Sequence, residues 1–342
     1  MSIVVSMKRP TIMDVARKCG LSKTTVSVIL NKTPASDRVP EETQKRVVEA
    51  AELLGYRPNW RARALASRKT HTVGVLYAPP MPLIVRGNYE GIMAGINEVL
   101  SRHNYHMMYV PLGENVEEWG RILLDQRMDG VLVLSRLREP LAEIITQARL
   151  CAALVNADTD LHLPTVIVDD YDGALQNTRH LIELGHERIT FLLGQQPPHY
   201  SVRQRQDGYT GAMRDAGLDE HVRAISSSVE DFVGAFVTSP PEQRPTAVVV
   251  YTHYMAVHLL RVLWEAGLSV PRDLSVVTFT NAFPVDDVIP PLTTIALPTE
   301  EMGRTAAQMV LEQIDTHGEA PKRRVVLKEQ LVVRKSTAPP EV

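Results

Sequence analysis

Near the N-terminus, apolar residues recur every three or four positions in three segments, which is the spacing of amphipathic helices. The segments are residues 11–18, 22–31 and 41–54. Gly20, between the first two, can adopt the left-handed conformation of a tight turn. Two short helices joined by such a turn and followed by a third predict a helix-turn-helix, whose second helix enters the major groove of DNA. An αα-hairpin in an ordinary core would show the same periodicity, so that alternative stays open.

The second segment, SKTTVSVILN, has two unlike faces. Val26, Ile29 and Leu30 follow the i, i+3, i+4 spacing of a buried face. The opposite side carries polar side chains and one valine, namely Lys23, Thr24, Ser27 and Val28. Ser22 would cap the helix, and the polar first turn lies where a DNA-reading helix meets base edges.

From residue 72 onward, short apolar runs alternate with amphipathic segments. The runs that read as strands are residues 70–78, 105–110, 129–135, 151–157, 164–170, 188–194, 246–252 and 274–280. The helical patterns are residues 87–103, 117–127, 173–185, 203–216, 254–266 and 299–316. This alternation predicts parallel sheets covered by helices. Two such sets predict two lobes with a cleft between them, and ligands bind at the carboxyl ends of parallel strands.

Charge is distributed unevenly along the 342 residues, whose net charge is −3. Residues 1–70 carry 14 Lys and Arg against 6 Asp and Glu, a balance of +8, and the remainder carries 23 against 34, a balance of −11. A basic head on an acidic body favours nucleic-acid binding by the head. No apolar run is long enough to span a membrane, and no signal-peptide core is found, so we expect a cytoplasmic protein.

Patterns typical of enzymes and metal sites are missing from the sequence. None of the 11 histidines has the HExxH or CxxC-type spacing that metal geometry requires. The pair Asp286 and Asp287 lies in a Pro-flanked loop without a nucleophile signature. Cys19 and Cys151 are far apart and are expected to be reduced. We therefore predict no catalytic residue, no metal site and no cofactor, and we do not expect an enzyme.

Several longer strings resemble the LacI/GalR family of bacterial transcription regulators. In the head they are TIMDVARKCGLSKTTVSVILN and VPEETQKRVVEAAELLGYRPN, and in the body GALQNTRHLIELGHERITFLLG and PPLTTIALPTEEMGRTAAQMVLEQI. The resemblance implies an all-α helix-turn-helix head joined to a two-lobed α/β core like that of periplasmic binding proteins. The implied boundaries are a head at 1–58, a hinge helix or linker at 59–70 and a core at 71–342. Within the core they are an N-lobe of about 71–168 plus 297–327 and a C-lobe of about 169–296 plus 328–342.

By this resemblance, the second helix of the head reads DNA. Lys23 and Thr24 match the positions that mainly choose bases, and Thr25 and Ser27 match phosphate-contacting positions. Val28 stands where the family usually has an arginine that reads guanine. A valine cannot make that hydrogen-bonded pair, although its methyl groups can pack against a thymine methyl. The sequence thus predicts an operator that differs from the family's usual one at this position, or weaker binding.

The hinge resembles a helix that orders on DNA and lies in the minor groove. Leu65 matches the residue that wedges a central base step, and Asn59 and Ala62 match neighbouring contact positions. A plain linker with one exposed leucine is the alternative. The full predicted set of DNA-contacting residues is Thr11, Ser22, Lys23, Thr24, Thr25, Ser27, Val28, Asn31, Asn59, Ala62 and Leu65.

The predicted cleft departs from the sugar-binding members of the family. Thr252 and His253 stand where an Asn-Asp pair is expected, and Thr280 and Asn281 replace a pair of aspartates. Arg205 is retained. Fewer carboxylates beside an arginine favour an anionic effector, such as a sugar acid or sugar phosphate. A neutral sugar and a cleft that has lost small-molecule binding stay open. The predicted effector-binding set is Asp172, Arg205, Thr252, His253, Thr280 and Asn281.

The resemblance also implies partners. It implies a homodimer whose heads bind the two halves of a near-palindromic double-stranded DNA operator. A small effector, sugar-related, would control operator affinity, and repression is the default outcome. The C-terminal RKSTAPPEV shows no heptad pattern, so a dimer is preferred to a tetramer. A solute-binding protein of the same core fold is the alternative, which the DNA-reading head argues against.

Overall fold

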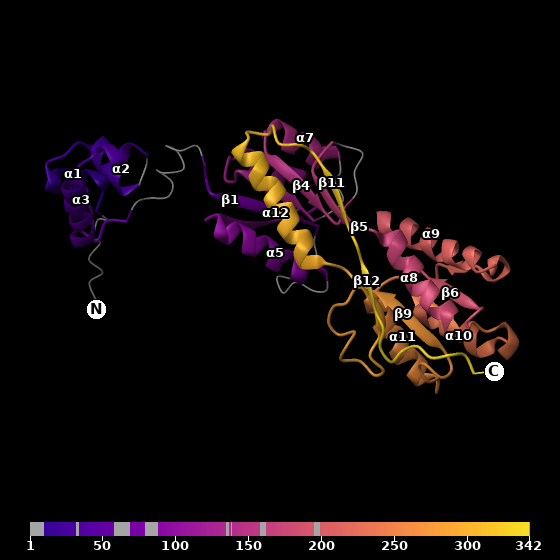
Figure 1. Ribbon diagram of the computed structural model, residues 1–342. Helices are drawn as coiled ribbons and strands as arrows, with labels where there is room; N and C mark the ends of the chain where they lie inside the picture. The colour runs from indigo at the N-terminus through magenta and orange to yellow at the C-terminus, as the bar shows by residue number, and fades with distance from the viewer. Residues whose placement is uncertain are drawn as a thin grey trace. The chain divides into compact units, whose positions relative to one another are not determined.

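The computed structural model divides the chain into two compact units, Met1–His71 and Thr72–Val342 (Figure 1). The structure describes residues 10–31, 34–57, 69–78, 88–134, 137, 139–157, 162–194 and 199–341. Each unit has its own hydrophobic core. None of the described helices is long and apolar enough to cross a lipid bilayer.

In its described residues, the first unit forms a head of three α-helices. Its elements are α1 (Ile12–Cys19), α2 (Lys23–Leu30), a short 3-10 helix η1 (Pro34–Arg38) and α3 (Glu41–Leu53). One core holds them together, and Val15, Val26 and Val47 are completely buried in it. Gly20 has a φ of 65° at the end of α1, a conformation that glycine adopts without strain. The predicted helix-turn-helix is confirmed.

The second unit contains two six-stranded sheets, and the first belongs to the N-lobe. Its strand order is β11-β5-β4-β3-β1-β2, and all its pairings are parallel. The strands are β1 (Thr72–Tyr77), β2 (His106–Pro111), β3 (Gly130–Val133), β4 (Cys151–Val155), β5 (Thr165–Val168) and β11 (Arg324–Leu327). The helices are α5 (Asn88–Arg102), α6 (Val116–Leu124), α7 (Glu139–Gln147) and α12 (Thr299–Asp315).

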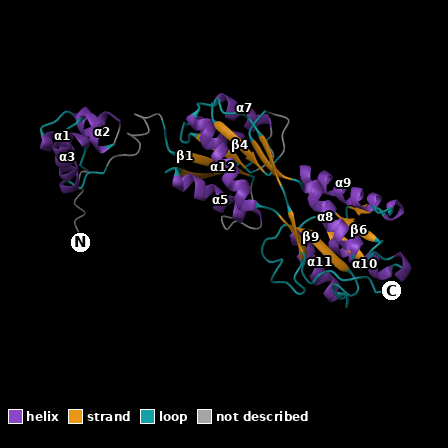
Figure 2. Cartoon of the chain, viewed as in Figure 1, coloured by secondary structure: helices purple, strands orange, loops and turns teal. Residues whose placement is uncertain are grey.

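The second sheet belongs to the C-lobe and has the order β12-β10-β9-β8-β6-β7, in which only β12 is antiparallel to its neighbour. The strands are β6 (Ile189–Leu192), β7 (Arg223–Ile225), β8 (Ala247–Val250), β9 (Ser275–Phe279), β10 (Thr293–Ala296) and β12 (Gln330–Val332). The helices are α8 (Asp170–Glu183), α9 (Tyr200–Asp215), α10 (Val229–Thr238) and α11 (His253–Glu265), with short 3-10 turns η2 (Asp219–His221) and η3 (Pro241–Gln243). Figure 2 shows helices flanking the strands of each sheet.

The alternation of strands and helices predicted from the sequence is confirmed, but several elements were missed. They are α7, α10, β7, β10, β11 and β12. The two shortest strands have three residues, too few for a period-2 pattern to show. In α10 the apolar residues are so frequent that the segment reads equally well as a strand or a helix.

Within the described part of the core, the chain crosses between the two sheets three times. The first crossing runs from β5 to α8 through Asp169, the second from β10 to α12 through residues 297–298, and the third from β11 to β12 through residues 328–329 (Figure 1). Around these crossings, helices pack at glycine contacts. A Cβ at Gly95 of α5 would overlap the backbone of α12, and one at Gly208 of α9 would overlap the backbone of α8. In each of these two pairs the helices therefore pack closely, with the glycine of one helix against the backbone of the other.

Candidate functional site: the DNA-reading helix and the interlobe pocket

The helix α2 has a capped first turn and an open outer face. Ser22 caps it, because its Oγ accepts a hydrogen bond of 3.0 Å from the Thr25 backbone N–H. The Ser22 and Thr25 hydroxyls are also 2.8 Å apart. Lys23 and Thr24 are exposed, and the predicted contacts Ser27 and Val28 are half-buried. The side chains of Lys23 and Thr24 in the first turn are thus accessible, as a helix that reads base edges requires.

The other predicted DNA contacts have different surroundings. The Thr11 N–H and hydroxyl donate to the Asp14 carboxylate at 2.9 and 2.8 Å, which makes Thr11 part of the cap of α1. Asn31 donates from Nδ2 to Ser27 Oγ at 3.1 Å, and its buried Oδ1 has no hydrogen-bond partner among the described residues. Asn59, Ala62 and Leu65, the predicted hinge contacts, lie outside the described residues.

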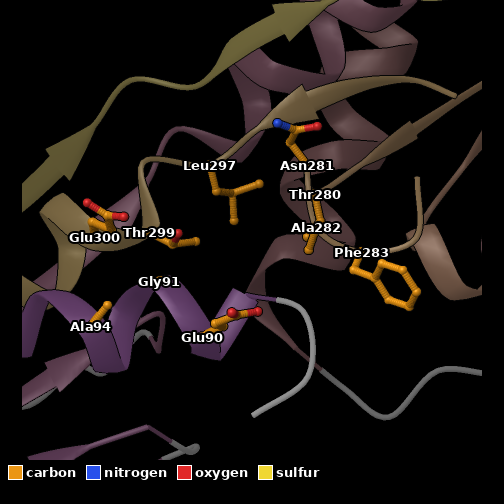
Figure 3. A pocket seen from close by; sticks show the side chains of 10 residues that line it. All are labelled: Glu90, Gly91, Ala94, Thr280, Asn281, Ala282, Phe283, Leu297, Thr299 and Glu300. Carbon is orange, nitrogen blue, oxygen red and sulfur yellow. The ribbon is translucent and has the colours of Figure 1, made fainter. Parts of the chain in front are cut away.

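A pocket of about 320 Å³ lies between the lobes beside the second crossing. Figure 3 shows its lining residues, which come from α5, from the loop after β9, from the link between β10 and α12, and from the start of α12. They are Glu90, Gly91, Ala94, Thr280, Asn281, Ala282, Phe283, Leu297, Thr299 and Glu300. Two of the six predicted effector residues, Thr280 and Asn281, therefore line this pocket. Asp172, Arg205, Thr252 and His253 do not.

Thr280 has an unusual backbone in the wall of this pocket. Its φ is 80°, a region that β-branched residues rarely occupy. The backbone holds it there, because its N–H donates to Ile295 O at 2.8 Å and its O accepts from the Thr294 hydroxyl at 3.2 Å. The residue is only 5% exposed, although it lines the pocket. Strain of this kind is characteristic of ligand sites.

The polar lining of the pocket consists of hydrogen-bonding groups and carboxylates. Glu90 comes from α5, and Glu300 of α12 pairs with Arg304 at 3.2 Å. Asn281 Oδ1 accepts from Arg334 at 2.5 Å, which leaves its amide N–H groups for another partner. Phe283 is 72% exposed and offers an aromatic face. No lysine or arginine is among the described lining residues. The sequence did not point to the N-lobe residues, because no motif links them to the cleft.

Arg205, the retained arginine, lies in the interior beside this region and is already paired. Its Nε donates to Asp170 Oδ1 at 2.7 Å and its Nη1 to Tyr251 O at 3.0 Å. The guanidinium carbon lies 4.2 Å from the centroid of the Phe279 ring, a cation–π contact. Arg205 is only 6% exposed. A guanidinium neutralised by Asp170 is not a free cation, which removes the sequence-based reason for an anionic effector.

Three side chains around Arg205 have buried polar atoms without a partner among the described residues. They are Asp170 at Oδ2, His253 at Nε2 and Glu329 at both carboxyl oxygens. Burial, reinforced by Asp170 and opposed by Arg205, raises the pKa of Glu329 to about 8. Burial, with Arg205 adding to it, lowers the pKa of His253 to about 4. At neutral pH both groups are therefore uncharged for the most part.

The remaining predicted effector residues support the local fold. The Thr252 hydroxyl caps α11 by accepting from the Met255 N–H at 3.3 Å. The Asp172 carboxylate accepts from Gln176 Nε2 at 2.7 Å. Both residues are half-buried near the carboxyl ends of their strands, but neither belongs to the described pocket lining.

A chain of hydrogen bonds leads from the Arg205 cluster to the N-lobe. Tyr251 OH is 2.9 Å from Ser201 Oγ, which is 2.7 Å from His199 Nδ1. His199 Nδ1 also accepts from the Ser201 N–H, so the ring proton is on Nε2, which donates to Asn156 O at 3.0 Å. Tyr200 OH donates to Asn156 Oδ1 at 3.2 Å. No motif in the sequence points to this contact, since Asn156 follows β4 and His199, Tyr200 and Ser201 begin α9.

Comparison with known proteins supports both parts of this architecture. Residues 11–59 match the family model of bacterial regulatory proteins of the lacI family, and residues 178–337 match a periplasmic binding protein-like domain. The HTH-type transcriptional regulator RegA of Clostridium saccharobutylicum is 31% identical over 342 residues, covering 96% of this chain and 99% of RegA.

Two solved structures extend the comparison. The transcriptional regulator CelR in complex with cellobiose is 29% identical and has a TM-score of 0.68. The match covers 96% of this chain and 100% of the CelR chain. The lac repressor dimer bound to operator and the anti-inducer ONPF is 26% identical and has a TM-score of 0.79. The match covers 97% of this chain and 100% of the lac repressor chain. The head and the two-lobed core thus match together, along nearly the whole length. The chain belongs to the lacI family of bacterial regulatory proteins, whose members are transcriptional regulators rather than enzymes.

Proposed function

We propose that this chain is a repressor that binds a near-palindromic DNA operator as a homodimer, under the control of a small molecule bound between the core lobes. The observation that carries the proposal is the interlobe pocket, which takes residues from both lobes beside a strained Thr280. Two similar structures support this proposal. The lac repressor was solved as a dimer bound to its operator, and CelR was solved in complex with cellobiose.

In the proposed DNA complex, the first turn of α2 lies in the major groove. Lys23 and Thr24 are exposed there and read bases, and Ser22, Thr25 and Ser27 approach phosphates. Val28 contacts a base pair through its methyl groups, so we expect thymine to be favoured at that position. Thr11, Asn31 and the hinge residues Asn59, Ala62 and Leu65 complete the proposed contact set.

For the effector, the structure favours the neutral alternative over the anionic one. The pocket lining offers hydroxyl, amide and carboxylate groups, which suit a ligand rich in hydroxyls, and Phe283 can cover an apolar ring face. An anion would meet Glu90 and Glu300 without a free cation among the described lining residues. We therefore propose a neutral, sugar-like effector.

The proposed mechanism couples the pocket to DNA through the lobes. Because α5 and α12 line one side and the loop after β9 lines the other, a bound ligand changes the relative stability of different lobe arrangements. In a dimer this alters the spacing of the two heads and so the operator affinity. The contact of His199 with Asn156 bridges the same two lobes and stabilises one of these arrangements.

Two measurements test the proposal. DNA selected from a random pool by the full chain should bind in a fluorescence-anisotropy assay with an affinity that falls steeply as salt rises. A salt-independent affinity would contradict the DNA-reading role. A thermal-shift screen of the full chain should then show stabilisation by neutral sugars. Stabilisation only by sugar acids or phosphates would overturn the neutral effector, and no response to any of these, or to nucleobases, would favour a pocket without a small-molecule role.

A further inference from the structure

Glu329 is a buried carboxyl group at a crossing between the lobes. It lies in the two-residue link from β11 to β12, so one neighbouring strand belongs to each sheet. The residue is 5% exposed, and neither carboxyl oxygen has a hydrogen-bond partner among the described residues. Leaving a buried carboxylate unpaired is costly, and a buried carboxyl group avoids the cost by keeping its proton. Because Glu329 is buried without such a partner, we expect its carboxyl group to keep its proton in this conformation.

The carboxyl group rests directly on α8. A Cβ built at Gly173 would overlap Glu329 Oε2, so only glycine at that position leaves room for the carboxyl group. The same glycine faces Ile295 of β10, which is apolar. Gly173 thus forms a seat that is shaped for a carboxyl group but supplies it with no hydrogen bond.

The charges around this seat are mostly negative. The start of α8 contributes Asp169, Asp170 and Asp172, each of which disfavours ionisation of Glu329. The helix α9 contributes Arg205, which favours ionisation but is already committed to Asp170, and Tyr200, which is neutral. On the crossing itself, Lys328 is exposed. The positive end of α8 is occupied as well, because Asp169 Oδ1 accepts from the Asp172 N–H at 3.1 Å.

Polar contacts fix the rest of this crossing to the same helix. Gln176 Nε2 donates to Asp172 at 2.7 Å and to Glu329 O at 3.4 Å, and Gln176 Oε1 accepts from the Leu331 N–H at 3.2 Å. The Asp169 N–H donates to Leu327 O at 3.0 Å, which joins the first crossing to the third. A change in the angle between the lobes must bend the chain at these crossings, beside the Glu329 side chain.

We propose that Glu329 is a protonation-controlled positioning residue of the hinge between the lobes. In the neutral form it sits on Gly173 and holds the third crossing against α8. The ionised form leaves this seat for water, away from three aspartates, and the crossing shifts with it. The pKa of about 8 places this change slightly above neutral pH. The consequence for DNA binding rests on the proposed coupling of the lobes to the operator.

The first test compares thermal unfolding of the full chain and its Glu329→Gln variant from pH 6 to 9.5. A carboxyl group whose pKa is higher in the folded state than in the unfolded state stabilises the folded protein. This stability is fully present below the pKa of the unfolded state and is lost as the pH rises through the folded-state pKa of about 8. We expect the melting temperature of the wild type to fall by several degrees between pH 7 and 9, and that of Glu329→Gln to stay level. Glu187→Gln, at an exposed carboxylate of the same lobe, should behave like the wild type. Equal pH profiles of wild type and Glu329→Gln would overturn the proposal.

A second measurement does not depend on the variant's folding. Infrared difference spectra of the wild type should show a protonated-carboxyl band that is present at pH 7 and lost by pH 9.5, and its absence at pH 7 would also overturn the proposal. Small-angle X-ray scattering should show a radius of gyration that changes over the same pH range. A radius that is unchanged, or that changes equally in Glu329→Gln, would refute the hinge role.

Operator affinity distinguishes this proposal from the proposed function. Affinity of the full chain for the selected DNA should change between pH 7 and 9 more in the wild type than in Glu329→Gln. If the pH-dependent melting and scattering are seen but the affinities change equally, the hinge residue stands and the coupling of lobes to DNA fails.

Discussion

His199 at the start of α9 and Asn156 at the end of β4 are joined by a hydrogen bond of 3.0 Å from Nε2 to the backbone oxygen, which connects the C-lobe to the N-lobe. The same ring accepts the Ser201 N–H at Nδ1 and so caps α9. Burial lowers the pKa of His199, which favours the neutral ring that both hydrogen bonds require. One side chain thus fixes a helix start and a contact between lobes.

Replacing His199→Phe should keep a planar ring but remove the hydrogen bond to Asn156 O and the two hydrogen bonds that Nδ1 forms with the Ser201 N–H and hydroxyl. Ser201, which is 3% exposed, would lose its acceptor, and α9 would lose its cap. We expect a loss of about 2 kcal/mol in the free energy of unfolding, measured with urea. His103→Phe, at an exposed position of the N-lobe, is the control and should change stability little. A loss no larger than that of the control would show that the contact contributes nothing.

Replacing Val28→Arg should move operator preference toward guanine at one position in each half-site. An arginine can bond guanine in the major groove, a pair that contributes roughly 1–3 kcal/mol of discrimination. Selection from a random DNA pool by wild type and variant measures the change. Val48→Arg adds the same charge on α3 and should strengthen binding without changing the preferred sequence. An unchanged profile for Val28→Arg would contradict the placement of α2.

Replacing Thr280→Asn should stabilise the fold and weaken effector binding. Asparagine tolerates a φ of 80° better than threonine, so about 1 kcal/mol of strain is released. The larger side chain enters the pocket and alters its hydrogen bonds. Urea unfolding and calorimetry with a sugar found by the thermal-shift screen measure the two effects. Thr299→Asn places the same side chain in the pocket at a residue with negative φ, and it should not raise stability.

Two glycine-to-alanine substitutions should change stability in opposite directions. A Cβ at Gly208 would overlap Tyr171 O, a backbone atom, so Gly208→Ala must separate α8 from α9. A Cβ at Gly234 of α10 meets nothing within 4 Å. We expect Gly208→Ala to lower the free energy of unfolding by about 2 kcal/mol or more and Gly234→Ala to raise it by up to about 1 kcal/mol. Similar effects of the two substitutions would show that α8 and α9 pack less closely.

Acid should destabilise the core partly through His253. Its pKa is lowered to about 4, so it contributes stability that is present above its unfolded value of 6.5 and lost as pH falls through about 4. The loss could reach about 3 kcal/mol. Urea unfolding between pH 7 and 4 should show a shallower decline for His253→Asn than for wild type. His106→Asn, at an exposed position, should follow the wild type, and a parallel decline of all three would exclude His253 as a cause.

The local periodicity of the sequence was enough to predict the head and most of the core. Val26 and Ile29 lie on the buried side of α2 because apolar residues at i and i+3 share one face of any helix. Long apolar runs such as those of β1 and β9 predicted buried parallel strands for a similar local reason. The β7 and β12 strands were missed, since three residues are stabilised by their sheet neighbours rather than by a pattern of their own.

The candidate site depended on contacts that the sequence does not encode locally. The retained Arg205 could be recognised from its motif, but its ion pair with Asp170 forms only where α8 and α9 meet. That pair decides that the arginine is not a free cation. Glu329 had no distinguishing neighbours in the chain, and its burial follows from the seat at Gly173. Local patterns of apolar residues are therefore enough to assign the buried faces of helices and strands. The neutralisation of charges follows from the tertiary fold instead, because burial and pairing depend on residues far apart in the chain.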